Sequence, residues 1–237
     1  MIQLKNFSIG FDKNKLLDEV EALFEPDCLT ALIGRNGSGK STLLKAMAGL
    51  NIKYEGEIFI DGENIRKLPR SLFARKLAYV NTQRPCIANL KVWDVVALGR
   101  SPYTGWNGNL SNKDKEIINH ALHLVKMESY SARNFNSLSD GESQKIMIAR
   151  AIAQDTKIIM LDEPTSFLDL PTRIELLSLL KLLCSKEGKT IIFSTHELDL
   201  ALKSSDYICL LENQKLLTLP PQTMKKHPSL LSMIGGI

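Results

Sequence analysis

A glycine-rich loop that ends in lysine, serine and threonine constrains the fold of this 237-residue chain more than any other feature. The loop fits the pattern GxxxxGK[ST] and consists of Gly34, Arg35, Asn36, Gly37, Ser38, Gly39, Lys40, Ser41 and Thr42. An apolar strand-like segment, residues 28–33, precedes it, and residues 41–50 follow it with helical composition. Such glycines let the backbone bend around an anion, and the helix N-terminus adds a positive dipole. The loop therefore predicts a phosphate site between a strand and a helix.

In that site we expect Lys40 to neutralise the β- and γ-phosphates of a nucleotide and the Ser41 hydroxyl to ligate Mg²⁺. The alternative is a glycine-rich turn that happens to end in a surface lysine. The position of the loop between a strand and a helix favours the phosphate site over that alternative.

Two consecutive carboxylates end an apolar strand later in the chain. Residues 158–161 are all apolar and lead directly into Asp162, Glu163 and Pro164. Ligands of open α/β sheets lie beyond the carboxyl ends of the strands, so these acids are expected to face the phosphate loop. We expect Asp162 to contact Mg²⁺ through water and Glu163 to be the general base for an attacking water. Without the phosphate loop, the sequence Asp-Glu-Pro would be read as an ordinary turn.

Two further features have both a structural and a chemical interpretation. Ser139 and Glu142 form a capping box at the start of an apolar-periodic helix, and Gly141 would allow a γ-phosphate to approach the same helix N-terminus. His196 follows the apolar strand 190–194. Such a histidine is often structural, but beside a γ-phosphate it could donate a hydrogen bond to the phosphate or to the attacking water.

Short apolar strands alternate with helical segments, which is typical of an α/β fold. The expected strands are residues 2–4, 7–9, 28–33, 57–62, 157–161, 190–194 and 207–211, and the expected helices are residues 41–50, 90–98, 113–127, 173–185 and 197–204. This order predicts a parallel sheet with helices on both faces. We expect one domain over residues 1–237, with a nucleotide-binding core at about 1–85 and 151–237 and a helical subdomain at about 86–150.

Charge and apolar runs exclude several classes of function. The net charge is only +4 and no block of basic residues occurs, so no nucleic-acid partner is expected. No segment resembles a secretory signal, and no apolar run is long enough to span a bilayer. The four cysteines are scattered without metal-ligand spacing. These features predict a cytoplasmic protein.

Taken together, the motifs resemble the ATP-binding subunit of ABC transporters, and the resemblance covers nearly the whole chain. Residues 138–142 resemble the LSGGQ signature and residues 166–169 resemble the D-loop. By the same resemblance, His196 is the switch histidine and Gln83 the Q-loop glutamine that senses the γ-phosphate and Mg²⁺. Phe11 would stack on adenine, at a place where tyrosine is commoner.

The resemblance implies the ABC form of the P-loop NTPase fold, with a small antiparallel β subdomain beside the parallel sheet. It also implies a head-to-tail homodimer with ATP and Mg²⁺ at the interface. Each ATP would be held by the phosphate loop of one copy and by Ser139, Asp140, Gly141 and Glu142 of the other. Mg²⁺ would contact Ser41, Gln83 and Asp162, and Glu163, His196 and Gln83 would be catalytic. Asp140 and Glu142 depart from the signature's glycine and glutamine and add negative charge.

Residues 97–106, together with Leu110, Ser111 and Asp114, are similar to one branch of the family. In that branch are the ATPases of bacterial importers for iron–siderophore, haem and cobalamin. This similarity implies that the chain has polytopic permease subunits and a periplasmic or extracellular substrate-binding protein as partners. It also implies that the chain is attached to the inner face of the cell membrane through the permease. Tyr103 and Trp106 could instead only pack the helical subdomain.

Two alternatives remain open at this point. The first is a non-transport ABC ATPase such as an iron–sulfur cluster assembly factor, which only the region 99–106 disfavours. The second is a binding module that holds ATP without turnover. Glu163 and His196 argue against this second alternative, because both residues suit hydrolysis.

Overall fold

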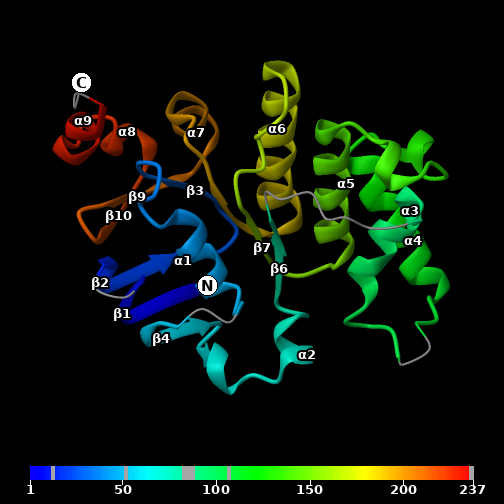
Figure 1. Cartoon of the computed structure of the whole chain (residues 1–237), viewed down its shortest axis with the longest axis horizontal. Helices are drawn as coiled ribbons and strands as arrows, with labels where there is room; N and C mark the ends of the chain where they lie inside the picture. The colour runs from blue at the N-terminus through cyan, green and yellow to red at the C-terminus, as the bar shows by residue number, and fades with distance from the viewer. Residues whose placement is uncertain (12–13, 51–52, 82–88, 106–107, 235–237) are drawn as a thin grey trace.

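The computed structural model describes residues 1–237 except 12–13, 51–52, 82–88, 106–107 and 235–237 (Figure 1). Two sheets and a set of helices make up the described part. The small antiparallel sheet lies beside the N-terminus, and several helices gather at the opposite end of the molecule (Figure 1).

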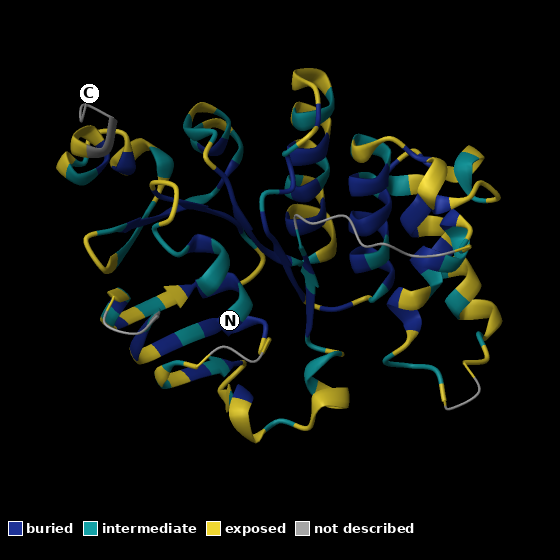
Figure 2. Cartoon of the chain, in the orientation of Figure 1, coloured by how far each residue is buried: buried dark blue, intermediate teal, exposed yellow. Residues whose placement is uncertain are grey.

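The large sheet has the strand order β10-β9-β3-β8-β7-β6. Its strands are β3 (Leu29–Ile33), β6 (Leu77–Val80), β7 (Ile158–Leu161), β8 (Thr190–Ser194), β9 (Tyr207–Glu212) and β10 (Lys215–Leu219). All neighbouring pairs are parallel except β9 and β10, which are antiparallel. Strands β3, β7 and β8 are buried along their whole length, because helices or the second sheet cover both faces (Figure 2). The carboxyl ends of the parallel strands therefore meet at one edge.

The small sheet is antiparallel and has the order β2-β1-β4-β5. Its strands are β1 (Ile2–Phe11), β2 (Asn14–Phe24), β4 (Glu55–Ile60) and β5 (Glu63–Asn64). The sequence predicted two short strands at residues 2–4 and 7–9, whereas the structure has one strand. Register shifts between Leu4 and Ile9 interrupt the pairing of β1 with β2, which explains the break in the hydrophobic alternation.

Nine α-helices and four short 3₁₀ helices lie in the described part of the chain. The α-helices are α1 (Lys40–Met47), α2 (Arg70–Phe73), α3 (Val92–Ala97), α4 (Asn112–Leu124), α5 (Asp140–Ala153), α6 (Leu170–Glu187), α7 (Leu198–Ser204), α8 (Pro221–Met224) and α9 (Pro228–Ile234). The 3₁₀ helices are η1 (Ile65–Lys67), η2 (Leu98–Arg100), η3 (Glu128–Tyr130) and η4 (Phe135–Ser137). The α/β class with an added antiparallel sheet agrees with the prediction, while the proposed division into subdomains stays a prediction.

Two hydrophobic clusters fill the molecule, one on each face of the large sheet. In β3, Leu29, Ala31 and Ile33 point into the cluster that contains α3 to α6, and Leu32 points into the cluster with α1 and the small sheet. Because side chains alternate along a strand, a single strand contributes to both clusters. Helix α1 thus lies between the two sheets, which holds the phosphate loop at the edge of the large one (Figure 1).

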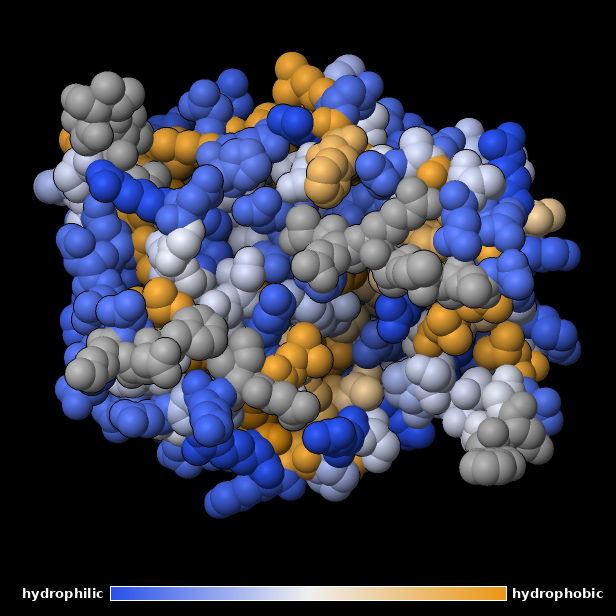
Figure 3. Space-filling view, viewed as in Figure 1, coloured by the Kyte–Doolittle hydropathy of each residue, from blue (hydrophilic) through white to orange (hydrophobic). Residues whose placement is uncertain are grey.

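Hydrophilic residues dominate the face of the molecule seen in Figure 3, with smaller hydrophobic patches between them. Among the residues that the structure describes, no helix combines the length and the apolar character needed to cross a membrane. Cys28, Cys184 and Cys209 are free thiols, and Cys86 lies outside the described residues. Burial raises the pKa of Cys184 to about 12 and that of Cys209 to about 11, so both are inert thiols at neutral pH.

Candidate nucleotide-binding site

The phosphate loop connects β3 to α1 and has the backbone shape that an anion site needs. Gly37 has a φ of 78° and Gly39 a φ of 106°, in the left-handed region that favours glycine. Gly39 is also the N-cap of α1 and accepts the first helical hydrogen bond from Leu43. The free N–H groups at the start of α1 are therefore available to an anion in the loop.

Lys40 is the first residue of α1 and is buried within its own loop. Its Nζ donates to the carbonyl oxygen of Gly34 at 2.9 Å and to that of Arg35 at 3.3 Å. Burial lowers the pKa of Lys40, while the charges of Glu163 and Asp162 oppose that shift. The ammonium group thus has few compensating anions, and a phosphate in the loop would supply one.

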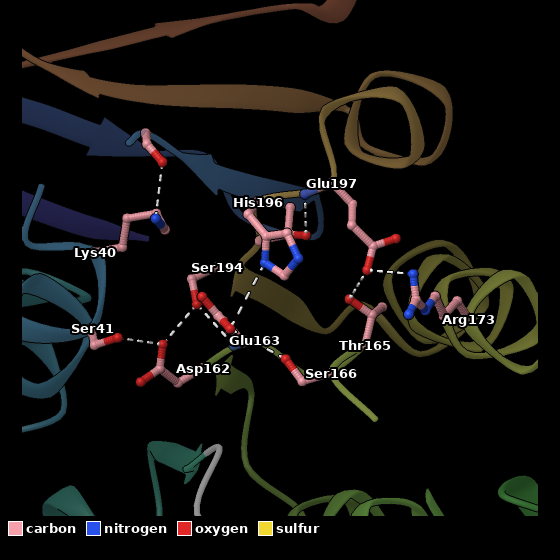
Figure 4. A network of polar contacts seen from close by, with 12 residues as sticks. Lys40, Ser41, Asp162, Glu163, Thr165, Ser166, Arg173, Ser194, His196 and Glu197 are labelled. Carbon is pink, nitrogen blue, oxygen red and sulfur yellow. Dashed lines mark hydrogen bonds and ion pairs between the residues drawn. The ribbon is translucent and has the colours of Figure 1, made fainter. Parts of the chain in front are cut away.

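Asp162 follows β7 and is 2% exposed. Its Oδ1 accepts hydrogen bonds from the hydroxyl of Ser41 at 2.8 Å and from that of Ser194 at 2.7 Å (Figure 4). The Tyr79 hydroxyl donates to Oδ2 at 3.4 Å. Burial, and then the charge of Asp162, raise the pKa of Tyr79, so that this phenol stays protonated and remains a donor. The Ser41 hydroxyl and the Asp162 carboxylate supply the oxygen ligands that Mg²⁺ prefers, so the residues present fit that ion.

Glu163 lies next to His196 at the edge of the large sheet. The Oε2 of Glu163 is 3.9 Å from Nδ1 of His196 and accepts a hydrogen bond of 3.2 Å from the Ser166 hydroxyl (Figure 4). The backbone N–H of Glu163 donates to Ser194 Oγ at 2.8 Å. The backbone of Glu163 has a φ of 46°, and a left-handed non-glycine residue at such a place is typical of functional sites.

One cavity of about 540 Å³ joins these elements. It is lined by Leu16, Asn36, Gly37, Gly39, Lys40, Ser41, Thr42, Glu163 and His196. We call it the phosphate cavity. Within it a cation, loop amides, a hydroxyl, a carboxylate and an imidazole face the same space, which is the set of groups that phosphoryl transfer requires.

The start of α5 forms a second, separate site. Glu142 N donates to Ser139 Oγ at 3.3 Å and Ser139 N donates to Glu142 Oε2 at 2.8 Å, so the predicted capping box is confirmed. The hydrogen bond from the Ser139 backbone holds the pKa of Glu142 below its usual value. The acidic side chain that departs from the family's glutamine is thus held at its own helix N-terminus.

A cavity of about 530 Å³ opens at this helix start, and we call it the signature cavity. Its lining consists of Ser139, Asp140, Gly141, Glu142, Lys145, Phe167, Leu168, Asp169 and Thr172. None of these residues lines the phosphate cavity. Within one chain the structure does not bring residues 139–142 to the phosphate loop, and their meeting with a neighbouring copy's phosphate loop stays a prediction.

Two further predicted site residues fall outside what the structure describes. Gln83 lies in the segment 82–88, beyond the described residues. Phe11 ends β1, and its side chain is not among those described. The roles expected for both residues stay predictions.

Sequence reasoning missed Ser194, Ser166 and Tyr79. Ser194 ends β8, so the rule that places ligands beyond the carboxyl ends of strands would have found it. The sequence places Ser166 only in the resemblance to the D-loop and gives no sign of its contact with Glu163. Tyr79 was missed because the short strand β6 was not recognised.

The fold and the site together define a P-loop ATP-binding cassette. A model of the family described as ABC transporter matches residues 17–166. The chain belongs to the ABC transporter family.

Several relatives are ATP-binding proteins of such systems. An uncharacterized ABC transporter ATP-binding protein of Methanocaldococcus jannaschii, MJ0873, is 38% identical over 96% of this chain and 79% of that protein. The petrobactin import ATP-binding protein YclP of Bacillus subtilis is 36% identical over 94% of this chain and 88% of its own length. The iron(3+)-hydroxamate import ATP-binding protein FhuC of the same organism is 33% identical over 89% and 78%.

Solved structures agree with this fold. A structure described as an inward-facing metal-chelate type ABC transporter has a TM-score of 0.85 at 26% identity and covers 99% of this chain and 88% of that chain. The ATP-binding cassette MJ0796, a dimer bound to ADP and Pi in a post-hydrolysis state, has a TM-score of 0.82 at 27% identity, with 93% and 99% covered.

Proposed function

We propose that this chain is the ATP-hydrolysing subunit of an importer for iron chelates of the siderophore type. The observation that carries the proposal is the phosphate cavity, in which Lys40, Ser41, Glu163 and His196 face one space. The relatives named for the import of petrobactin and iron(3+)-hydroxamate support the class of cargo, as does the metal-chelate type transporter.

In the proposed mechanism, the loop amides and Lys40 bind the β- and γ-phosphates of ATP, and Lys40 exchanges the carbonyls of Gly34 and Arg35 for phosphate oxygens. Ser41 and Asp162 would hold Mg²⁺ with their hydroxyl and carboxylate oxygens. When bound, that ion neutralises charge on the phosphates. The buried position of Asp162 keeps its carboxylate in one orientation.

Glu163 and His196 carry out the hydrolysis step. Glu163 accepts a proton from a water whose oxygen bonds to the γ-phosphorus, and the bond from that phosphorus to the bridging oxygen breaks, which releases ADP and phosphate. The Ser166 hydroxyl donates to this carboxylate, and Ser194 holds the backbone of Glu163 by accepting from its N–H. His196, whose side chain is 56% exposed, donates a hydrogen bond to the γ-phosphate.

A second copy of the chain completes the site. The signature cavity of one copy covers the phosphate cavity of the other, and Ser139 to Glu142 contact the γ-phosphate there. Gln83 senses the γ-phosphate and Mg²⁺, and Phe11 stacks on adenine. The dimeric cassette MJ0796 with ADP and Pi supports this arrangement.

Closure of the dimer on ATP drives a polytopic permease, which receives the chelate from a periplasmic or extracellular substrate-binding protein. In this assembly the chain lies on the inner face of the cell membrane, attached through the permease. The names of the import ATP-binding relatives support this placement.

The test of catalysis is Glu163→Gln, which keeps the shape of the side chain and removes the base. Turnover of ATP should fall by at least about 100-fold, the contribution of a positioned general base, while the affinity for ATP is retained. Glu187→Gln, at the far end of α6, should turn over like the wild type. Turnover of Glu163→Gln at the wild-type rate would remove Glu163 from this role.

The test of transport is purification of the chain from its native membranes in mild detergent. Recovery of a permease, with iron-chelate uptake that depends on this chain, supports the proposal. Recovery of a soluble sulfur-mobilising partner in its place would favour an iron–sulfur cluster assembly factor and overturn it.

A further inference from the structure

We propose that Glu197 and Arg173 are positioning residues of the same reaction, which join the segment that carries His196 to the loop that follows Glu163. This inference rests on the ATPase function proposed above. It concerns how the general base and the histidine keep their relative position, and neither Glu197 nor Arg173 is itself a lining residue of the phosphate cavity.

We call the contacts among Glu197, Arg173, Thr165 and Leu168 the clamp, and Figure 4 shows those of Glu197 with Thr165 and Arg173. Oε1 of Glu197 lies 3.0 Å from Nη1 of Arg173 and accepts a hydrogen bond of 3.2 Å from the Thr165 hydroxyl. Nε of Arg173 donates to the carbonyl oxygen of Leu168 at 2.7 Å. Thr165 is buried and the Glu197 side chain is 14% exposed, so solvent screens these contacts less than it screens a surface ion pair.

The identity of residue 197 indicates a role beyond the helix that it begins. Glu197 is the N-cap of α7, yet its side chain makes no capping hydrogen bond. Serine, threonine, aspartate and asparagine are the usual N-cap residues, because their short side chains reach the first backbone N–H groups. The longer glutamate instead reaches away from α7 to Thr165 and Arg173.

The position of His196 depends on its backbone. Its side chain is 56% exposed, and the 3.9 Å between its Nδ1 and Glu163 Oε2 exceeds the length of a hydrogen bond. The clamp holds the next residue, Glu197, to Thr165, which is two residues beyond Glu163. The backbone segments that carry Glu163 and His196 are thereby held to each other. Loss of the clamp would let their separation vary without removing either group.

The experiment measures ATP turnover of the purified full chain with Glu197→Ala. We expect kcat to fall about tenfold while KM for ATP stays within about twofold, because a misplaced histidine affects the transition state more than ground-state binding. Glu197→Gln keeps an acceptor oxygen at the same reach and should restore most of the turnover. Glu197→Asp keeps the charge but is shorter and should not. Recovery by Glu197→Asp alone would overturn the proposal.

A double-mutant cycle separates positioning from general stability. If Glu197 acts through His196, Glu197→Ala should have no further effect on kcat once His196→Ala is present. An equal loss of kcat in both backgrounds would overturn the proposal. Should Glu197→Ala fold poorly, Arg173→Lys is the second variant. It keeps the charge but cannot contact Glu197 and the Leu168 carbonyl together, and it should reproduce the fall in kcat.

The matched control removes a different ion pair of the same helix. Glu175→Ala breaks the exposed contact of 3.2 Å between Lys126 and Glu175 and should leave kcat and KM unchanged. The Glu163→Gln variant distinguishes the two proposals. If it turns over like the wild type, the proposed catalytic function fails. If it is inactive and Glu197→Ala is unchanged, only the clamp fails.

Discussion

Ser41 and Asp162 are joined by a hydrogen bond of 2.8 Å from the serine hydroxyl to Oδ1. The contact ties the start of α1 to the end of β7, so the phosphate loop and the acidic strand end are held together by a direct hydrogen bond. Ser194 donates to the same carboxylate oxygen from the neighbouring strand. Three elements far apart in the sequence thus meet at one oxygen atom.

Removal of the Ser194 hydroxyl should disturb both acids of the site. In Ser194→Ala, Asp162 loses a donor and the N–H of Glu163 loses its acceptor. A buried polar group left without a partner costs about 1–3 kcal/mol, and we expect this fall in the free energy of unfolding together with slower ATP turnover. Chemical denaturation and a turnover assay measure both. Ser204→Ala in α7 is the control, and equal behaviour of the two variants would contradict the prediction.

Removal of the Lys40 ammonium should weaken nucleotide binding. A hydrogen bond to a charged group contributes about 1.5–3 kcal/mol, so Lys40→Ala is expected to raise the Kd for ATP by about 10- to 100-fold. Titration with a fluorescent ATP analogue measures this change. Lys45→Ala, one turn further along α1, should bind like the wild type. Retained affinity in Lys40→Ala would contradict the phosphate-loop interpretation.

Enlargement of Gly99 should destabilise the contact of η2 with α5. A Cβ at this position would lie 2.3 Å from the carbonyl oxygen of Arg150, and a backbone atom cannot move away cheaply. Overpacking of this kind typically costs about 1–3 kcal/mol, so Gly99→Ala should lower the melting temperature. Ser101→Ala, two residues further along and exposed, should melt like the wild type. A melting temperature of Gly99→Ala equal to that of the wild type would show that the contact relaxes.

Asp114 should make stability depend on acid pH. Hydrogen bonds from the hydroxyl and amide of Ser111, and then from Arg100, lower the pKa of Asp114 from 3.8 to about 2. A lowered carboxyl pKa stabilises the fold above the unfolded value, and this contribution is lost as the pH falls from about 4 to about 2.

In Asp114→Asn we therefore expect a loss of about 2 kcal/mol at neutral pH and a flatter stability profile between pH of about 4 and 2. Denaturant unfolding across that range measures the profile. The exposed Glu116 of the same helix provides the control as Glu116→Gln. A profile of Asp114→Asn parallel to that of the wild type would contradict the prediction.

Arg100 and Tyr103, in the described part of the region 97–106, have a packing role. Arg100 is buried, pairs with Asp114 at 2.8 Å and lies 4.1 Å from the ring of Tyr103. The guanidinium carbon of Arg75 also lies over the Tyr103 ring, 5.2 Å from the ring centroid. Tyr103 thus contacts Arg100 of the expected helical subdomain and Arg75 of the expected core, so the expectation that it only packs the helical subdomain stays a prediction, and Trp106 lies outside the described residues.

Motifs defined by local geometry could be predicted from the sequence, and contacts between distant segments could not. The phosphate loop and the capping box at Ser139 depend on residues within one turn, so spacing alone identifies them. Asp162 and Glu163 could be placed because a strand end in a parallel sheet has a known position.

The remaining contacts depend on which strands are neighbours. Ser194 contacts Asp162 only because β8 lies beside β7. Hydrophobic periodicity predicts strands but does not predict which strands are neighbours. Strand β6 has four residues, too few to show a period, and β2 was missed although it pairs with β1 along its length. Glu197 and Arg173 come from different elements, so their ion pair required the tertiary structure.

The phosphate cavity and the signature cavity have no described lining residue in common. Defects in the two cavities of a head-to-tail pair would therefore be able to complement each other. One copy with Lys40→Ala and another with an altered Ser139 would place both lesions in one composite site and leave the other site wild type. Co-expression of two inactive alleles would then restore a single working ATP site per pair.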